Sequence, residues 1–364
     1  MIYLDNAATT PICEAARKTI IEHINTFGNP SSIHALGNES RVLIENARER
    51  IAKCINANPE HIYFTSGGSE ANTLALNKRH HSASSKFEHH SVVTDWPKIS
   101  ITKDGFIKAH KLNNMLSEWW EVPFTVMSCM HANNEIGTIQ PVKELATIAH
   151  RYGILFHTDA VQAMPYIPID VKDIGCDMLS ASGHKFGAPK GVGFLYANSR
   201  SRVKPIINGG KQESGIRPGT ENILGILSMA SALEDTIEHM DERNAYIKSL
   251  RDNLLEKLLK IDGSHLNGSL ENRVPGNINI RFDGVSGARL VTLCSLYDVY
   301  ISAGSACNEG IPTPSHVIKA IGLSDEDALS SIRITLGHQN TKEEVDIAAD
   351  IITALVTRIR SNES

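Results

Sequence analysis

Short apolar runs alternate with amphipathic segments along the first half of the chain. Ile62–Thr65 and Ile154–Thr158 are compact runs of β-forming residues, whereas residues 40–55 carry apolar side chains at helical spacing. Pro141 suits the first turn of a further helix. Strands alternate with helices in this way from about residue 60 to 197, which predicts an α/β fold with a mainly parallel sheet covered on both faces.

Polar clusters follow four of the expected strands. In parallel sheets that are covered by helices, ligands bind beyond the carboxyl ends of the strands. The four clusters are Thr65–Ser69, His131–Glu135, Asp159–Gln162 and Ser182–Lys185. The sequence therefore predicts one site at a single edge of the sheet.

The remainder of the chain predicts a smaller α+β domain. Residues 222–260 form a long amphipathic segment that leads to it. Beyond this segment we expect strands at 277–282, 298–302 and 331–336, helices at 286–296, 315–321 and 341–360, and a loop at 303–314. We divide the chain into a large domain, 13–245, and a small domain made of 1–12 and 246–364.

Composition restricts the class of protein. The chain has 364 residues, of which 41% are hydrophobic and 21% charged, as in a soluble globular protein large enough for two domains. We expect no membrane span, since no apolar run approaches roughly 18 residues, and no secretory signal, since the N-terminus has no basic region followed by an apolar stretch. A net charge of -5 without a basic block argues against nucleic acid as the main partner.

The cysteine and histidine residues do not form a metal or disulfide framework. Six cysteines are scattered without a C-x-x-C pair, which is typical of a reduced, cytoplasmic chain. His80–His81 and His89–His90 invite a metal interpretation, but neither pair has a carboxylate at helical spacing. We therefore expect no metal site.

Lys185 comes at the end of an apolar strand, next to a hydroxyl and an imidazole. A lysine there suits a Schiff base with pyridoxal phosphate, and a surface lysine in a turn is the alternative. Asp159 also ends an apolar run, where a protonated pyridine nitrogen would balance its charge; a helix N-cap is the alternative. Residues 67–69 lie at a strand-to-helix turn, whose N–H groups suit a phosphate.

Two residues of the expected small domain are also candidates. Cys307 lies in a small, Pro- and Gly-rich segment that predicts an exposed mobile loop, so its thiol is either a nucleophile or an incidental surface cysteine. Arg333 lies in an apolar strand, where it can hold a substrate carboxylate through two parallel hydrogen bonds or form an internal salt bridge.

In combination these motifs resemble the cysteine desulfurases of the NifS and IscS type, in the class V aminotransferase group of fold-type I pyridoxal phosphate enzymes. The matching stretches are Tyr3–Thr10, Phe27–Ser32, Thr65–Glu70, Glu88–His89, Asn133–Gly137, His157–Gln162, Ser182–Lys185, Arg217–Thr220 and Gly304–Cys307, and Arg333 extends the match. The resemblance implies a large domain with a mainly parallel, seven-stranded sheet and a smaller α+β C-terminal domain.

The resemblance also implies a role for each candidate residue. Lys185 would bind the cofactor and later move the Cα proton, His89 would stack on its ring and assist proton transfer, and Cys307 would attack the substrate sulfur. The remaining contacts would be Asp159 to the pyridine nitrogen, Gln162 to the phenolic oxygen, Gly68, Ser69, Ser182 and His184 to the phosphate, and Asn134 with Arg333 to the bound substrate. Thr220 would reach the phosphate of the neighbouring subunit in a homodimer.

The implied activity is the removal of sulfur from L-cysteine, which leaves L-alanine and a Cys307 persulfide for an acceptor protein. Iron–sulfur clusters, tRNA and DNA modification are the possible destinations of the sulfur. A selenocysteine lyase or another class V enzyme is an alternative, and so is a non-catalytic sulfur-relay scaffold. Residues 77–88 and 92–123 are short for the family, and the chain ends at Ser364 soon after its last expected helix. We therefore expect a remodelled sheet edge and an acceptor other than the usual iron–sulfur scaffold.

Overall fold

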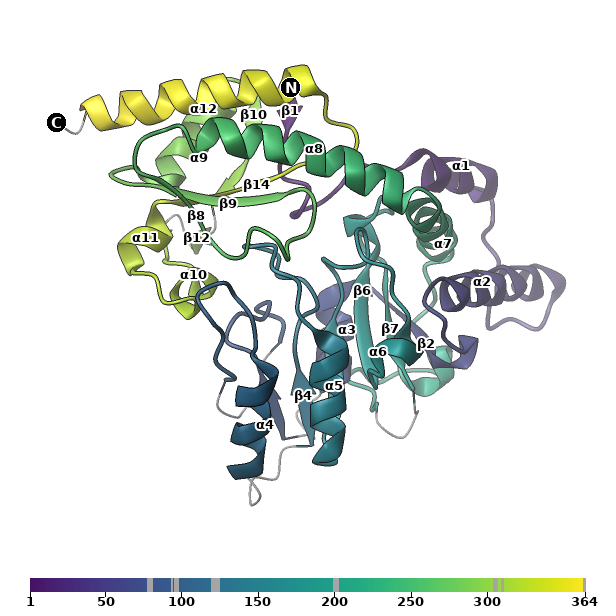
Figure 1. The fold of residues 1–364 in the computed structure, drawn as a ribbon. Helices are drawn as coiled ribbons and strands as arrows, with labels where there is room; N and C mark the ends of the chain where they lie inside the picture. Colours follow the sequence, from purple (N-terminus) through teal and green to yellow (C-terminus); the bar gives the residue numbers. More distant parts are fainter. Residues whose placement is uncertain are drawn as a thin grey trace.

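The computed structural model describes residues 1–76, 81–92, 94, 98–118, 125–198, 203–303, 307–308 and 311–362. These residues form two sheets with helices packed around each (Figure 1). Within them, no helix combines the length and the apolar character that crossing a membrane requires.

The larger sheet has six strands in the described residues, where the resemblance implies seven. Their order is β2 (Ile62–Thr65), β7 (Gly193–Ala197), β6 (Met178–Ser182), β5 (Leu155–Asp159), β4 (Val126–Ser128) and β3 (Ser82–Ser84). Strands β3 to β6 are mutually parallel, as expected. Strand β7 is antiparallel to both of its neighbours. For β6 the reason is the short connection at 183–192, which cannot make the long crossover that a parallel pair needs.

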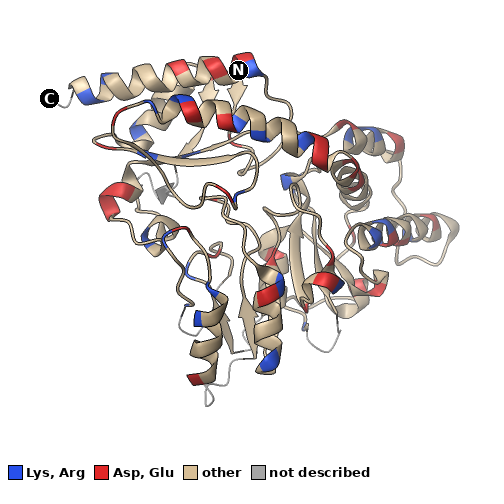
Figure 2. Ribbon diagram, in the orientation of Figure 1, with Lys and Arg blue, Asp and Glu red and all other residues tan. Residues whose placement is uncertain are grey.

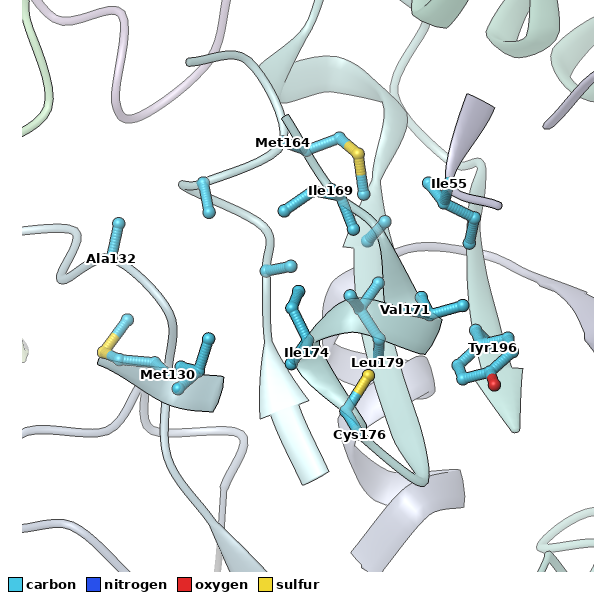
Figure 3. Close-up of a cluster of buried hydrophobic side chains, with 14 of the residues drawn as sticks. Ile55, Met130, Ala132, Met164, Ile169, Val171, Ile174, Cys176, Leu179 and Tyr196 are labelled. Carbon is cyan, nitrogen blue, oxygen red and sulfur yellow. The ribbon is translucent and has the colours of Figure 1, made fainter. Parts of the chain in front are cut away.

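Helices cover this sheet on both faces. They are α1 (Glu14–His23), α2 (Ala35–Cys54), α3 (Gly68–Leu76), α4 (Ala109–Glu118), α5 (Val142–Arg151), α6 (Val171–Ile174) and α7 (Ile223–Glu238), with short 3-10 turns η1 (Pro59–His61), η2 (Gly183–Lys185) and η4 (Gln212–Gly215). Helix α3 packs against β6 and β7, and α1 and α2 pack against α7. Figure 3 shows part of the resulting core, where Val171 and Ile174 of α6 lie beside Leu179 of β6.

The smaller sheet is antiparallel and lies above the larger one in Figure 1. Its order is β11 (Ser302–Ala303), β14 (Ser331–Thr335), β9 (Asn277–Phe282) and β8 (Ser264–Leu266). Helices α8 (Met240–Leu258), α9 (Gly287–Leu296) and α12 (Lys342–Asn362) pack around it, and α10 (His316–Ala320) and α11 (Asp325–Leu329) follow the loop of Cys307. Two short pairs complete the fold: β1 (Ile2–Tyr3) with β10 (Val299–Tyr300), and β12 (Cys307–Asn308) with β13 (Ile311–Pro312).

The described residues form three hydrophobic cores, two on the larger sheet and one on the smaller sheet. The N-terminal Ile2 and Leu4 belong to the core of the smaller sheet, so the first residues pack beside that sheet as expected. We propose the division at residue 245 on this basis, although Val317 and Ile318 of α10 pack into the larger core. The expected long segment at 222–260 is two helices, because the chain breaks at His239 between α7 and α8.

Candidate active site

A cavity of about 340 Å³ lies where β5 and β6 end and where β14 approaches them. It brings together ten of the residues that the sequence singles out. Its lining is Ala7, Ala8, Gly68, Ser69, Asn72, His89, Met130, Asn134, Asp159, Val161, Gln162, Ser182, His184, Lys185 and Arg333. The prediction that polar clusters converge at one edge of the sheet is therefore confirmed.

Lys185 follows β6 in the turn η2 and is held by backbone oxygens. Its Nζ donates hydrogen bonds to Ala7 O at 2.6 Å and to Ala8 O at 2.7 Å. Burial, with a smaller effect of the Arg333 charge, lowers the pKa of Lys185 to about 8. At pH 7 about a tenth of this lysine is thus the neutral amine, which is the form that attacks a carbonyl carbon and is far rarer in an ordinary lysine.

The N-terminal segment that accepts these bonds is fixed to the smaller sheet. Ala7 N donates to Thr335 Oγ1 at 2.9 Å, and Asn6 Nδ2 donates to Thr335 O at 2.8 Å. Ala7 O also accepts from Gln162 Nε2 at 2.8 Å. One backbone oxygen therefore holds two of the predicted site residues, Gln162 and Lys185.

Asp159 ends β5 and is 3% exposed. Its Oδ1 accepts a hydrogen bond from Val161 N at 2.9 Å, and its Oδ2 accepts from Asn72 Nδ2 at 2.7 Å. The first contact stabilises a turn at 161–166 and not a helix, so the structure does not support the helix N-cap alternative. Both donors are neutral, so the carboxylate can still bind a cationic ligand group.

A hydrogen-bonded chain connects Asp159 to His89. Asn72 Nδ2 also donates to Ser91 Oγ at 2.8 Å, and Ser91 Oγ lies 2.7 Å from His89 Nδ1. Because Ser91 N donates to the same Nδ1 at 3.1 Å, this nitrogen is an acceptor and the proton of the neutral ring is on Nε2. Partial burial lowers the pKa of His89, which favours that neutral form.

The start of α3 forms a cradle opposite β6. A Cβ at Gly68 would lie 2.7 Å from Val161 Cγ2, so only glycine lets the helix start come this close to the end of β5. Ser182 and His184 line the other side, and His184 Nδ1 lies 3.1 Å from Thr9 Oγ1. Burial lowers the pKa of His184 to about 4, so at neutral pH its ring offers a neutral hydrogen-bond donor or acceptor.

Arg333 on β14 closes the cavity. Its Nη2 donates to Asp5 Oδ1 at 2.8 Å and its Nη1 donates to Asn134 O at 3.0 Å. The internal salt bridge that the sequence left as an alternative is therefore present. The Nε atom is buried without a hydrogen-bond partner among the described residues.

Two predicted residues are not part of the described cavity. The backbone of Cys307 forms β12, opposite Pro312 of β13, and its side chain lies outside the described part of the structure. Thr220 is exposed and does not line the cavity within one chain. It stands three residues after Arg217, whose Nε donates to Glu70 Oε1 at 2.9 Å.

Several residues of the site escape reasoning from sequence. Asn72 had a detectable signal, because it is a single amide in the otherwise apolar second half of α3. Ser91 had no such signal. Ala7 and Ala8 had none either, since any residue type can provide a backbone oxygen. The pairing of Asp5 with Arg333 joins residues that are far apart in the chain.

The cavity fits pyridoxal phosphate on the chemistry of its donors and acceptors. Among the described residues, Lys185 Nζ donates only to carbonyl oxygens and Asp159 accepts only from neutral donors, and Gly68 and Ser69 place the start of α3 at the cavity. Together the fold and this cavity define an α/β enzyme of the pyridoxal phosphate class.

The family model "Aminotransferase class-V" matches residues 2–347. A relative from Dictyoglomus turgidum, "Cysteine desulfurase IscS", is 41% identical over 384 residues, which cover 99% of this chain and 95% of the relative. A solved structure described as "NIFS-LIKE PROTEIN" has a TM-score of 0.89 at 32% identity, with 98% of this chain and 99% of that chain covered. Another, "SspA in complex with cysteine", has a TM-score of 0.79 at 31% identity, with 94% and 100% covered.

The chain belongs to the class-V aminotransferase family and, within it, to the cysteine desulfurases of the IscS and NifS type. It is accordingly a pyridoxal phosphate-dependent enzyme that removes sulfur from cysteine.

Proposed function

We propose that Lys185 moves protons on bound L-cysteine in this cavity and that Cys307 takes the sulfur. The observation that supports this proposal is the convergence of Lys185, Asp159 and Arg333 on one cavity. Bound pyridoxal phosphate supplies an electron sink for the substrate Cα–H bond. The protein supplies Lys185, whose pKa of about 8 lies closer to neutrality than that of an ordinary lysine, as suits a general base.

The cofactor contacts follow from the positions of the side chains. Asp159 would hold the ring nitrogen, and Asn72 and Val161 N keep its carboxylate oriented. Gln162 would donate to the phenolic oxygen after releasing Ala7 O. The phosphate would lie among Gly68, Ser69, Ser182 and His184, at the start of α3.

The substrate contacts come from the opposite wall. Arg333 and Asn134 would hold the α-carboxylate, and His89 would present its Nε2 proton beside the ring. Cys307 Sγ, as thiolate, would attack the substrate sulfur. The Cβ–S bond then breaks with its electron pair going to carbon, which takes a proton to become the methyl group of alanine, and an S–S bond forms on Cys307.

We further propose a homodimer in which Thr220 reaches the neighbouring phosphate. The segment between α1 and α2 exposes large apolar side chains, with Phe27 80% and Ile33 100% exposed. A hollow of about 520 Å³ separates this segment from the one that precedes Thr220, as Pro30, Ser31, Lys211 and Gln212 all line it. An exposed apolar surface of this kind is typical of an interface between subunits.

The dimer has a direct test. Phe27→Asp and Ile33→Asp should each give a monomer by light scattering and weaken cofactor binding, whereas Leu296→Asp, at a 75% exposed apolar position on α9, should stay dimeric. A Phe27→Asp protein that remains dimeric would exclude this interface.

We infer that the reaction takes place in the cytoplasm and that the sulfur passes to an acceptor protein. The cysteines of known placement, Cys13, Cys54, Cys129, Cys176 and Cys294, are all free thiols, as in a reducing compartment.

The decisive experiment uses isotopically labelled cysteine. Cys307→Ala should abolish both persulfide and alanine while the protein keeps its bound cofactor, and Cys13→Ala, a half-buried cysteine, should behave as wild type. Alanine release that survives in Cys307→Ala would exclude the proposed role. Selenocysteine turnover by the same variant would favour a selenocysteine lyase, and a protein that stays colourless with added cofactor would favour a scaffold.

A further inference from the structure

A second hollow, of about 850 Å³, opens next to the cavity between the segment after β3 and helix α10. His89 lines both spaces, and Pro314, at the end of the Cys307 loop, lines the hollow. Figure 2 shows basic segments on α10 and on the chain that follows β3. We call this space the basic hollow.

Positive charge dominates the basic hollow. Lys86, Lys98 and Lys319 line it, and all three are exposed. Lys319 is paired with Asp325 at 2.7 Å, whereas no carboxylate of the described residues pairs with Lys86 or Lys98. Among the residues that the structure describes, two lysines of the hollow are therefore not ion-paired.

The carboxylate among the lining residues faces the protein interior. Glu88 is 4% exposed; its Oε1 accepts hydrogen bonds from Ser85 Oγ and, at 2.9 Å, from Met130 N. Burial raises the pKa of Glu88 to about 7, so it carries only part of a negative charge at neutral pH. The charge of Lys98 opposes this rise, so Glu88 balances the charge of the exposed lysines only in part.

The two walls of the basic hollow are joined to each other. His316 Nε2 donates to Glu88 O at 2.9 Å, and the rings of His316 and His90 lie 4.7 Å apart. The segment that carries His89 is thereby fixed to the start of α10, directly after the Cys307 loop. A group bound in the hollow therefore lies beside both the segment of His89 and the start of α10.

We propose that the basic hollow binds an acidic segment of the sulfur-acceptor protein and thereby directs that protein's thiol to Cys307. This inference rests on the proposed function. The acceptor thiolate attacks the outer sulfur of the Cys307 persulfide, a new S–S bond forms on the acceptor, and the old S–S bond breaks with its electron pair leaving on Cys307 thiolate. The step needs no further oxidant or reductant.

An acidic protein segment fits better than a nucleic acid. The chain has a net charge of -5, which repels a long polyanion, whereas two lysines without an ion pair among the described residues match a short acidic stretch. The described lining also contains no aromatic ring other than imidazole on which a base would stack.

The test uses synthetic peptides of equal length that carry one cysteine and either four glutamates or four lysines. With labelled cysteine as sulfur donor, the acidic peptide should accept sulfur about tenfold faster at low salt, and the difference should shrink at high salt. Lys86→Glu/Lys98→Glu should reverse the preference. The matched control, Lys172→Glu/Lys342→Glu, changes the net charge equally at exposed lysines outside the hollow and should keep the wild-type preference.

Alanine release with dithiothreitol as reductant separates the two proposals. Suppose that every variant releases alanine normally. The basic hollow is then not the docking site if sulfur transfer is equally fast to the acidic and the basic peptide, or if both double variants change the peptide preference alike. If the wild type releases no alanine, the proposed function itself fails. Sulfur transfer is also measured with oligouridylate or a cysteine-free acidic peptide as inhibitor. Inhibition by oligouridylate that requires Lys86 and Lys98, without inhibition by the acidic peptide, would overturn the proposal of a protein partner in favour of RNA.

Discussion

Ser315 Oγ donates a hydrogen bond to Glu135 Oε2 at 2.5 Å, and the same Oγ accepts from Val317 N at 3.1 Å as the N-cap of α10. Glu135 follows Asn134, which lines the cavity, and Ser315 follows the loop of Cys307. Ser315, which follows the loop of Cys307, is thus tied to the segment that would hold the substrate under the proposed function. This contact anchors the chain at the start of α10.

Removing this anchor should slow the reaction more than it unfolds the protein. Ser315→Ala leaves the buried Glu135 without its donor, a loss of about 1–3 kcal/mol. We expect alanine release to fall about tenfold, measured in steady state with cysteine, while the visible absorbance of the cofactor is unchanged. Ser324→Ala removes the corresponding N-cap of α11 without touching a buried carboxylate, and equal effects of the two variants would contradict the anchor.

The buried carboxylates make folding stability depend on pH. Burial raises the pKa of both Glu88 and Glu135 from 4.5 to about 7. Between these values the folded protein binds protons that the unfolded chain releases, so this contribution to stability is present below about pH 4.5 and is lost as pH rises through about 7.

Replacing these carboxylates should remove that dependence. Relative to wild type, Glu88→Gln/Glu135→Gln should gain a few degrees in Tm between pH 5 and pH 8, measured by calorimetry of the apo protein. Glu49→Gln, at an exposed position of α2, should show a difference from wild type that is constant with pH. If the Tm difference between the double variant and wild type does not change with pH, burial does not raise the pKa of Glu88 and Glu135.

Much of the fold could be predicted from periodicity. The expected strands at Ile62–Thr65 and 277–282 are β2 and β9, because apolar runs of this length bounded by turn residues have few other interpretations. The break at His239 was missed, since no glycine or proline marks it. The expected strand at 298–302 is divided into β10 and β11 because its two halves pair with different partners.

The site was predictable where function restricts residue type. Lys185, Asp159 and Arg333 stand out as charged residues in apolar runs, whereas the contacts that orient them come from Ala7, Ser91 and other residues remote in sequence. Such contacts depend on tertiary packing, which residue spacing does not encode.

Asn72 should be required for cofactor binding although it is not expected to touch the substrate. Asn72→Ala removes the donor of both Asp159 Oδ2 and Ser91 Oγ. We expect the cofactor dissociation constant to rise about tenfold, measured by retention of visible absorbance on dialysis. The nitrogen NMR signals of His89 should also change, because the hydrogen bonding at its Nδ1 loses support. Thr73→Ala, an exposed neighbour on α3, is the control that should change neither.

Arg333→Lys should weaken substrate binding selectively. A lysine keeps the charge but lacks the planar fork that reaches Asp5, Asn134 O and a carboxylate together. The KM for cysteine should rise about tenfold or more with a smaller change in kcat. Arg281→Lys, on the adjacent strand β9 and paired with Asp327, should leave KM unchanged; an equal rise there would indicate a general loss of structure.

Cofactor binding by the apo enzyme should follow the ionisation of Lys185. Because only the neutral amine attacks the cofactor, the binding rate should rise about tenfold per pH unit below about 8 and level off above it. Stopped-flow absorbance from pH 6 to 9 measures this profile. Arg333→Gln removes a charge that lowers the pKa of Lys185, so the profile should move to higher pH, and Arg281→Gln should not move it. An unmoved profile in Arg333→Gln would show that Arg333 does not act on the lysine.

The carbonyl of Ala7 determines how this chain could be divided. It belongs to a segment anchored on the smaller sheet, yet it accepts from Lys185 and Gln162 on the larger one. A fragment of residues 13–245 would retain the six strands and still leave the lysine without either of its backbone acceptors. Exchanging the small domain between relatives would therefore also exchange the backbone oxygens that hold Lys185. A chimaera would need its first nine residues to match the large domain as well as the small one.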